Sequence, residues 1–227
     1  ILFITGLLLF FTCQDQTKQS NLNTDINPFF QEWDTPYKIP PFLYIKDEHY
    51  MPAFEKGMEE NLKEIDEIVT NSTPPTFANT IEELERTGKL LSRVQRTFFN
   101  LAGSNTNPKL QELQRELSPI LSAHYDKIVL NKGLFLRVEK LWESRKNLGL
   151  TSEQLKLLQD TRKQFVRSGA LLNDQQKAQI TTINSKISEL TTTFGQNLLA
   201  ETNGFELILS KNDLEGLSED VIAAASE

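Results

Sequence analysis

Apolar residues recur every three or four positions through most of the chain, from residue 51 to residue 198. This spacing places them on one face of an α-helix and leaves the charged residues opposite. Turn-forming stretches such as "NSTPPTF" (71–77) and "GSNTNP" (103–108) interrupt the pattern. The sequence therefore predicts a mainly α fold, organised as a multi-helix bundle.

The apolar stripes assign the inward face of each expected helix. In chain order they are Met51, Phe54, Met58, Leu62, Ile65 and Val69; Ile81, Leu84, Leu91, Val94, Phe98 and Leu101; Leu110, Leu113, Leu117, Leu121, His124 and Ile128; Leu134, Val138, Leu141 and Trp142; Leu155, Leu158, Phe165 and Leu172; and Ile180, Ile183, Ile187, Leu190, Phe194 and Leu198. The last stripe also fits a coiled-coil seam. Core packing within the bundle is the preferred interpretation.

Residues that cap helices stand where most of these stripes begin. Their side-chain oxygens accept hydrogen bonds from the free N–H groups of a first turn. The expected N-caps are Asn79 or Thr80, Asn107 (followed by Pro108), Asn131, Thr151 (in a capping box with Gln154), Asn173 and Ser218. Gly149 is the expected C-cap of the helix that follows Asn131, and Gly88 interrupts the helix that follows Asn79.

Two segments are expected to be non-helical. Residues 27–44, "NPFFQEWDTPYKIPPFLY", hold four prolines, each of which disfavours helix at the residue before it. The six aromatic residues of this segment make it too apolar for a free linker, so we expect an extended strap laid over the helical body. The run "FELILS" (205–210) follows Gly204 and predicts one short strand.

The first 13 residues predict an export signal. Residues 1–11 are apolar at nearly every position, a length that suits the core of a signal peptide and is about half of what a membrane-spanning helix needs. Cys13, the only cysteine, comes next, and residues 14–26 form a polar tether. We expect a truncated leader (1–13) of the bacterial lipoprotein type, lipidation at Cys13, and export to the cell envelope as a periplasmic or membrane-anchored protein.

Other interpretations of this end of the chain stay open. The leader could be a cleaved signal beside a free Cys13, residues 1–11 could form a buried strand, and the protein could be cytoplasmic. Because residue 1 is not Met and no basic residue precedes the apolar run, we expect a longer reading frame upstream. The helix that follows Ser218 is expected to continue beyond Glu227.

Composition restricts the partners and the means of stabilisation. The net charge of −7 and the pI near 5.1 argue against a nucleic-acid partner, whose phosphates attract clustered Lys and Arg. A single cysteine permits no internal disulfide. Residues 27–227 are sufficient for one domain with its own core.

Few residues could carry catalysis. His49 and His124 are 75 positions apart and form no His-x-x-x-His pair. Asp47, Glu48 and His49 point in different directions at a helix start, where acidic residues favour the helix dipole. His124 is expected to be a hydrogen-bonded core or rim histidine. Three groups of carboxylates are expected on solvent-facing surfaces: Glu59–Glu60, Glu82–Glu83, and Glu64 with Glu67. We therefore predict no catalytic, cofactor-binding or metal-binding residue here, and Cys13 as the one modification site.

Seven stretches, collinear over about residues 27–227, carry a family resemblance. They are "NPFFQEW" (27–33), "PPFLYIKDEHYMPAFEKGMEENLKEI" (40–65), "PPTFANTIEELERTGKLLSRVQRTFFNLAGSNTN" (74–107), "LNKGLFLRV" (130–138), "LGLTSEQLKLL" (148–158), "FVRSGALL" (165–172) and "TTFGQNLLAET" (192–202). They resemble the N-terminal region of the M3 family of zinc metallopeptidases, and within it the peptidyl-dipeptidase (Dcp-like) branch. The general oligopeptidase branch shares the opening of the second stretch but is less similar across "FFNLAGSNTN".

The resemblance implies a helical, two-lobed enzyme whose deep channel admits short, unstructured peptides and releases dipeptides from their C-termini. In the family, a His-Glu-x-x-His motif and a further Glu hold zinc, and none of these residues occurs in the 227 positions. We therefore expect this chain to form one wall of the channel, and to be inactive without the catalytic lobe of the same polypeptide, which would hold the zinc.

The expected partners are the peptide substrates and that lobe, with no nucleic acid, a membrane contact only through a lipid anchor, and a monomeric state. The alternative is a self-contained helical-bundle lipoprotein that acts as a binding module.

Overall fold

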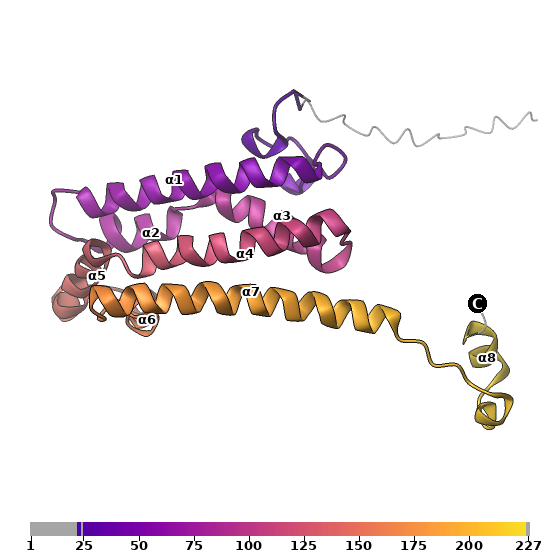
Figure 1. Cartoon of the computed structure of the whole chain (residues 1–227). Helices are drawn as coiled ribbons and strands as arrows, with labels where there is room; N and C mark the ends of the chain where they lie inside the picture. Colours follow the sequence, from indigo (N-terminus) through magenta and orange to yellow (C-terminus); the bar gives the residue numbers. More distant parts are fainter. Residues whose placement is uncertain (1–21, 24, 226–227) are drawn as a thin grey trace, which may run out of the picture.

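The structure is a computed structural model that describes residues 22–23 and 25–225 (Figure 1). Those residues form helices and no strand, which confirms the mainly α fold. The helices are α1 (Tyr50–Thr70), α2 (Glu83–Arg86), α3 (Lys89–Ser104), α4 (Pro108–Val129), α5 (Lys132–Ser144), α6 (Ser152–Ser168), α7 (Asp174–Gly204) and α8 (Glu219–Ala225). The shorter helical turns are η1 (Pro28–Phe30), η2 (Pro36–Lys38), η3 (Asp47–His49), η4 (Phe77–Glu82), η5 (Arg145–Asn147) and η6 (Lys211–Leu214). The leader and Cys13 lie outside the described residues.

None of the helices in the described part of the chain combines the length and the apolar character that crossing a bilayer requires.

Local capping signals account for most helix starts. The side chains of Asn107, Asn131 and Asn173 accept hydrogen bonds from backbone N–H groups in the first turns of α4, α5 and α7. Thr151 and Gln154 make both bonds of a capping box: Thr151 Oγ1 accepts from the Gln154 N–H at 3.2 Å, and Gln154 Oε1 accepts from the Thr151 N–H at 3.1 Å. These four predicted N-caps are confirmed.

One predicted cap is wrong. The N-cap near residue 79 is Thr76, and Asn79 is the third residue of that turn, where its Oδ1 accepts from the Thr76 N–H at 2.8 Å. At the other end of α5, Arg145 donates to the Trp142 carbonyl at 2.6 Å and its guanidinium lies 3.9 Å from the centre of that ring. The α-helix ends at Ser144, the 3-10 turn η5 extends the helical run to Asn147, and Gly149 follows with φ +61°, the left-handed conformation expected of a glycine that ends a helix.

Gly88 splits the helix predicted from residue 79 to residue 101. Its backbone adopts φ +70°, which favours glycine, and its N–H donates to Glu64 Oε2 of α1 at 2.6 Å. The π-helical turn η4 and α2 therefore precede this point, and α3 starts afresh at Lys89.

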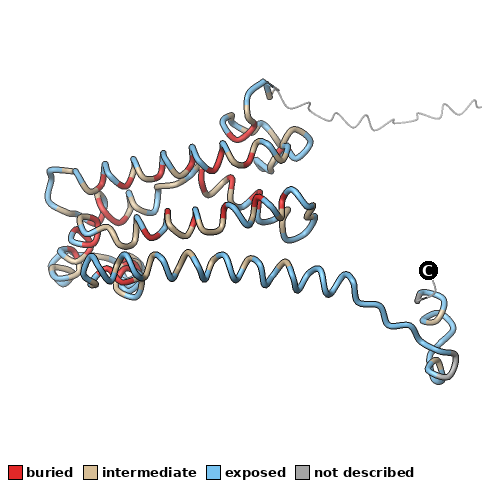
Figure 2. The backbone as a smooth tube through the Cα atoms, viewed as in Figure 1, coloured by how far each residue is buried: buried red, intermediate tan, exposed pale blue. Residues whose placement is uncertain are grey.

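Two buried clusters form the core, and α1 contributes to both (Figure 2). The first joins the strap to α1, α3 and α4 through Phe29, Tyr50, Ala53, Phe54, Leu91, Val94, Phe98, Leu110, Leu113, Leu117 and Leu121. The second joins α1 to η4, α5 and α6 through Ile65, Ile68, Phe77, Ile81, Leu134, Phe135, Val138, Leu141, Leu158, Phe165 and Ala170. Removing these apolar side chains from water is the main driving force for folding.

The inward face of α1 differs from the predicted stripe by about one position. Tyr50, Ala53, Gly57 and Asn61 are buried, whereas Met58 is only half-buried. A Cβ atom at Gly57 would lie 2.9 Å from the Cα atom of Leu91, closer than real Cβ contacts allow. Gly57 thus lets α1 and α3 approach closely, and small or polar residues take inward positions that an apolar pattern cannot mark.

The strap prediction is confirmed at one end. Phe29 is fully buried and lies 5.5 Å, centroid to centroid, from Tyr50 of α1. Trp33 donates from Nε1 to the Pro28 carbonyl at 2.9 Å. Tyr37 and Leu43, farther along, are almost fully exposed. The strap is therefore anchored near Phe29, with two 3-10 turns, η1 and η2, within it.

Two expectations for the C-terminal part are wrong. Residues 205–210 pair with no strand in the described part of the chain, and Ile208 is 88% exposed, because an apolar run makes a strand only where another strand is available to pair with it. The apolar stripe of α7 joins neither cluster, and no residue of α7 is buried. The helix lies along α4 instead through its polar face.

Candidate functional site

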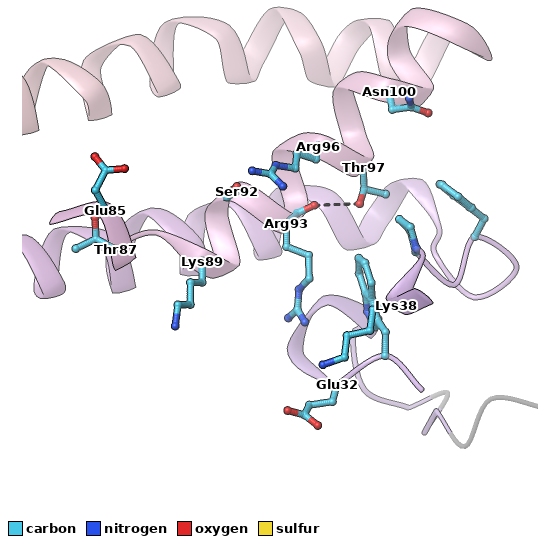
Figure 3. Close-up of a pocket in the computed structure, with 13 residues that line it drawn as sticks. Glu32, Lys38, Glu85, Thr87, Lys89, Ser92, Arg93, Arg96, Thr97 and Asn100 are labelled. Atoms are coloured by element: carbon cyan, nitrogen blue, oxygen red, sulfur yellow. Dashed lines mark hydrogen bonds between the residues drawn. The ribbon is translucent and has the colours of Figure 1, made fainter. Parts of the chain in front are cut away.

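A groove of about 790 Å³ lies between the strap and α3, and we call it the strap groove (Figure 3). Its lining residues are Glu32, Trp33, Lys38, Pro40 and Phe42 from the strap, Glu85 and Thr87 from α2 and the turn after it, and Lys89, Ser92, Arg93, Arg96, Thr97 and Asn100 from α3. The groove thus depends on how the strap is held against α3.

Arg93 holds the strap in place. Its Nη1 donates to the Gln31 carbonyl at 3.2 Å, its Nη2 donates to the Phe29 carbonyl, and its guanidinium lies 5.0 Å from the centre of the Trp33 ring. Burial lowers the pKa of Arg93, although Glu32 and Glu60 act in the opposite direction. Arginine stays charged at neutral pH in proteins, and the contacts of this cation are with the strap.

The other cations of the strap groove are available to a ligand. The side chains of Lys38, Lys89 and Arg96 are exposed and make no hydrogen bond or ion pair within the described part of the chain. Figure 3 shows Lys89 and Arg93 leaving the same side of α3. With only Glu32 and Glu85 as acidic lining residues, the groove carries excess positive charge. It can attract an anionic group such as a carboxylate.

None of the hydroxyl groups that line the strap groove is hydrogen-bonded to a basic side chain or a carboxylate. No His or Cys is among its lining residues, and the Thr97 hydroxyl donates to the Arg93 carbonyl at 3.0 Å, drawn as the dashed line in Figure 3. A nucleophile needs an adjacent base to be activated. The groove is therefore a candidate binding surface.

His124 is the hydrogen-bonded core histidine that the sequence predicts. It is 3% exposed, and its Nε2 lies 2.9 Å from Oδ1 of Asn61, which is also buried. Its Nδ1 is buried and has no hydrogen-bond partner within the described residues. Burial, and secondarily the charge of Lys127, lower the pKa of His124. The ring is therefore neutral at pH 7, with Nε2 as the donor to Asn61.

The lowered pKa of His124 predicts a loss of stability in mild acid. The unfolded chain takes up this proton near pH 6.5 and the folded chain does not, so unfolding becomes easier as the pH falls below that value. The expected slope is up to about 1.4 kcal/mol per pH unit. Urea unfolding between pH 7.5 and 5.5 measures it. The His124→Gln variant should lose this component and the His49→Gln variant should keep it; equal slopes in all three proteins would contradict it.

His49 and its acidic neighbours shape the start of α1. His49 Nδ1 accepts from the Lys46 N–H at 3.0 Å, and Asp47 Oδ2 accepts from Asn107 Nδ2 at 3.2 Å. The side chain of Asn27 donates to the His49 carbonyl at 2.8 Å. These contacts join the strap, η3 and the start of α4, and His49 and His124 take part in separate hydrogen bonds with different partners.

The paired carboxylates behave largely as predicted. Glu82 and Glu83 both approach Arg86, at 3.5 Å and 2.8 Å, on an exposed surface. Such exposed pairs contribute little to stability. Glu64 differs, because it accepts the N–H of Gly88 and fixes the break before α3. Sequence reasoning missed this role.

The described residues do not fit a zinc site. Zinc in proteins takes three or four close nitrogen, sulfur or oxygen ligands. No group of three or more His, Cys, Asp or Glu side chains lies close enough to hold a metal ion in the part of the chain that the structure describes. His124 offers no such site, because its Nε2 is hydrogen-bonded to the Asn61 amide and its Nδ1 is buried with no other ligand group beside it among the described residues.

Arg137 is an important residue that sequence reasoning also missed. It is 8% exposed on α5, and it donates to the Asn71 carbonyl at 3.0 Å, to Asn79 Oδ1 at 3.0 Å and to Thr80 Oγ1 at 3.3 Å. It makes no ion pair in the described part of the chain, and burial lowers its pKa. Its partners are in η4 and in the loop between α1 and η4, so the role is structural. The one sequence signal for its burial is that it directly precedes Val138, which the apolar stripe places on the inward face.

Comparison with known proteins identifies relatives over most of the chain. No family model matches. Dipeptidyl carboxypeptidase of Escherichia coli is 39% identical over 205 residues, which cover 90% of this chain and 30% of the relative. The Salmonella typhimurium protein of the same name is 38% identical over 202 residues, 88% of this chain and 30% of the relative. Oligopeptidase A of Escherichia coli is 26% identical over 192 residues, 84% of this chain and 28% of the relative.

The chain therefore spans about 30% of the length of the curated relatives it matches. Identity is higher to the dipeptidyl carboxypeptidases than to oligopeptidase A, which agrees with the branch that the motif "FFNLAGSNTN" indicates. The three matches cover 84–90% of the chain and exceed what shared helical composition could produce. Over about 90% of its length the chain is therefore homologous to dipeptidyl carboxypeptidase, and more distantly to oligopeptidase A, both peptidases of the M3 family.

Proposed function

We propose that this chain is the helical segment of a zinc-dependent peptidyl-dipeptidase that removes dipeptides from the C-termini of short peptides. The observation that supports this proposal is the 39% identity to dipeptidyl carboxypeptidase over 90% of the chain. The lower identity of 26% to oligopeptidase A favours the dipeptide-releasing branch over a general oligopeptidase.

The zinc and the catalytic residues of this proposal belong to another part of the polypeptide. The described residues do not fit a metal site, and no hydroxyl that lines the strap groove is hydrogen-bonded to a carboxylate or a histidine. The role of this chain is then to shape the space in which peptides are held. The expected export to the cell envelope and the lipidation of Cys13 stay predictions of the sequence.

The strap groove is the surface that we propose faces the peptide channel. Its excess of positive charge suits the carboxylates of peptide substrates, and its aromatic residues Trp33 and Phe42 can contact apolar side chains. Exposed cations act at a distance and are screened by salt. They are therefore expected to affect the binding of substrate and not the rate of its cleavage.

This assignment predicts the kinetics of a Lys38→Ala/Lys89→Ala variant in the full-length enzyme. KM for a short peptide should rise roughly fivefold at low ionic strength while kcat stays close to that of the parent, because the two cations bind ground state and transition state alike. The effect should shrink at about 0.5 M salt. The matched control is Lys163→Ala, which removes an exposed charge from α6. A KM equal to that of the parent would exclude the strap groove from the channel.

The proposal as a whole is tested by the reading frame that contains this sequence and by the metal content of its product. The frame should encode His-Glu-x-x-His with a further Glu downstream, and the purified full-length protein should carry about one zinc per polypeptide. Peptide cleavage should disappear when a chelator removes the metal. A frame without that motif would overturn the proposal and favour the binding-module alternative.

A further inference from the structure

α7 packs on α4 through polar side chains. The two helices run antiparallel, from Lys177 Nζ, which donates to the Leu130 carbonyl at 3.0 Å, to Gln196 Nε2, which donates to the Gln111 carbonyl at 2.8 Å (Figure 1). Between these ends, Asn184 donates to Asp126 Oδ1 at 2.9 Å and the Thr192 hydroxyl donates to Ser118 Oγ at 2.7 Å. The face of α7 turned to the bundle is therefore hydrophilic.

The opposite face of α7 is apolar and exposed. Ile183 and Thr192 are nine positions apart, which is about 180° of rotation at roughly 100° per residue. The exposed fractions on the apolar face are Ile183 56%, Ile187 56%, Leu190 55%, Phe194 67% and Leu198 56%. Figure 2 shows α7 coloured as exposed along most of its length. We call these five residues the α7 stripe.

The orientation of α7 is the reverse of what α4 alone would select. A surface helix turns its apolar side toward the core and its polar side toward water. Contiguous exposed apolar side chains such as those of the α7 stripe mark interaction surfaces on proteins. The polar side chains of α7 make specific hydrogen bonds with α4, and these bonds fix the orientation of the helix. A second surface must cover the stripe.

The flanks of the α7 stripe argue against a second copy of the chain as that surface. Self-associating helical seams carry charged residues beside the apolar positions, and these set register and partner. Within the range of the stripe, Lys186 and Glu189 are charged and pair with each other at 2.8 Å, and no charged residue stands from Leu190 to Leu198. Depletion of charge on both sides of an apolar patch is typical of the centre of a large, permanently buried interface.

The exposed apolar surface continues beyond α7. Phe205 is 73% exposed, Leu207 is 70% exposed and Ile208 is 88% exposed in the extended segment that follows the helix. This segment leads away from the bundle toward α8 (Figure 1). The relatives that match this chain are about three times its length, so a surface of the required size is available in a polypeptide of their length.

We propose that the α7 stripe is an intramolecular docking face for the catalytic part of the same polypeptide, which covers it with an apolar helical surface. The proposal rests on the proposed function, since it needs that longer polypeptide. In the proposed full-length enzyme, α7 is a central helix whose polar side packs on α4 and whose apolar side packs on the catalytic part. The helix then connects the two parts of the enzyme.

Thiol accessibility in the full-length protein tests the docking. Three variants are made in a Cys13→Ser background: Ile187→Cys and Leu190→Cys on the stripe, and Thr193→Cys as the matched control. Thr193 is exposed and lies about 100° of rotation from both Phe194 and Thr192, so it belongs to neither face. Maleimide labelling of each site is followed by mass spectrometry of the peptide that contains it.

The two stripe cysteines are expected to react at least about tenfold more slowly than Thr193→Cys, at a ratio that does not change on dilution. Equal rates at all three sites would overturn the docking face and leave the peptidase proposal intact. Protection that disappears on dilution would assign the stripe to a second copy and would also overturn it. A reading frame without the zinc motif would overturn the proposed function and, with it, this inference.

Thermal unfolding of the full-length protein provides a second measurement should a cysteine variant fold poorly. Leu190→Asp places a charge in the covered face, and its melting temperature is expected to fall by about 5 °C or more. Thr193→Asp adds the same charge one turn away at an exposed position and should leave the melting temperature within about 1 °C of the parent. Equal melting temperatures for the two variants would contradict the docking face.

Discussion

Replacing Arg137 by methionine is expected to lower the free energy of unfolding by about 3 kcal/mol. Methionine fills part of the space of the arginine side chain, but it cannot donate to the Asn71 carbonyl, Asn79 or Thr80. The Asn71 carbonyl and Thr80 Oγ1 then lose their donor, whereas Asn79 Oδ1 keeps the Thr76 N–H and the Thr80 hydroxyl. An unsatisfied buried polar group costs about 1–3 kcal/mol. The loss is therefore larger than that of an ordinary surface contact.

Urea unfolding measures this loss, and hydrogen exchange locates it. Exchange should accelerate first in the loop 71–76 and in η4, which Arg137 ties to α5. Lys140→Met is the matched control, because Lys140 is exposed on the same helix, and it should change stability by less than about 0.5 kcal/mol. Equal effects of the two substitutions would show that Arg137 does not organise the loop.

Replacing Phe29 by alanine is expected to cost about 3–4 kcal/mol and to release the strap. Phe29 is fully buried, and its ring lies 5.5 Å from Tyr50 and 6.0 Å from Trp33. Removal of the ring eliminates these contacts and leaves a cavity. It also weakens the hydrogen bond that Arg93 donates to the backbone carbonyl of residue 29. Because the strap forms one side of the groove, this loss should also open the groove.

Fluorescence of Trp33 reports the release of the strap directly. In a Trp142→Phe background, which leaves Trp33 as the only tryptophan of the sequence, the Phe29→Ala variant should show emission shifted to longer wavelength under native conditions. The control is Phe30→Ala at the next position. Phe30 is 37% exposed and contacts Lys56 across 4.4 Å, so this variant should lose about 1 kcal/mol or less and keep the parent emission. An unshifted Phe29→Ala spectrum would contradict the anchoring role.

The features that the sequence predicts correctly are those decided by neighbouring residues. The box between Thr151 and Gln154 forms within one turn, and Asn107 with Pro108 starts α4 by the same local rules. Periodicity likewise reveals that residues 180–198 form an amphipathic helix. It cannot tell what the apolar side of that helix faces, and α7 turns this side away from α4 because its partner there is a row of polar contacts.

The features that the sequence missed depend on residues far apart in the chain. The hydrogen bonds of Arg137 reach acceptors 57–66 positions away, and the Arg93 bonds that form the strap groove reach 62 and 64 positions. No spacing rule connects such residues. His124 was predictable in kind, because a lone histidine on an apolar stripe needs a partner, but nothing in the pattern identifies that partner as Asn61.

The central claim is that this helical segment belongs to an enzyme that shortens peptides two residues at a time from the C-terminus. The most direct test is to incubate the full-length protein with an N-terminally acetylated short peptide and to identify the products by mass spectrometry. We expect successive losses of dipeptides from the carboxyl end, with the acetylated end intact. An uncleaved peptide, or losses of single residues, would contradict the claim.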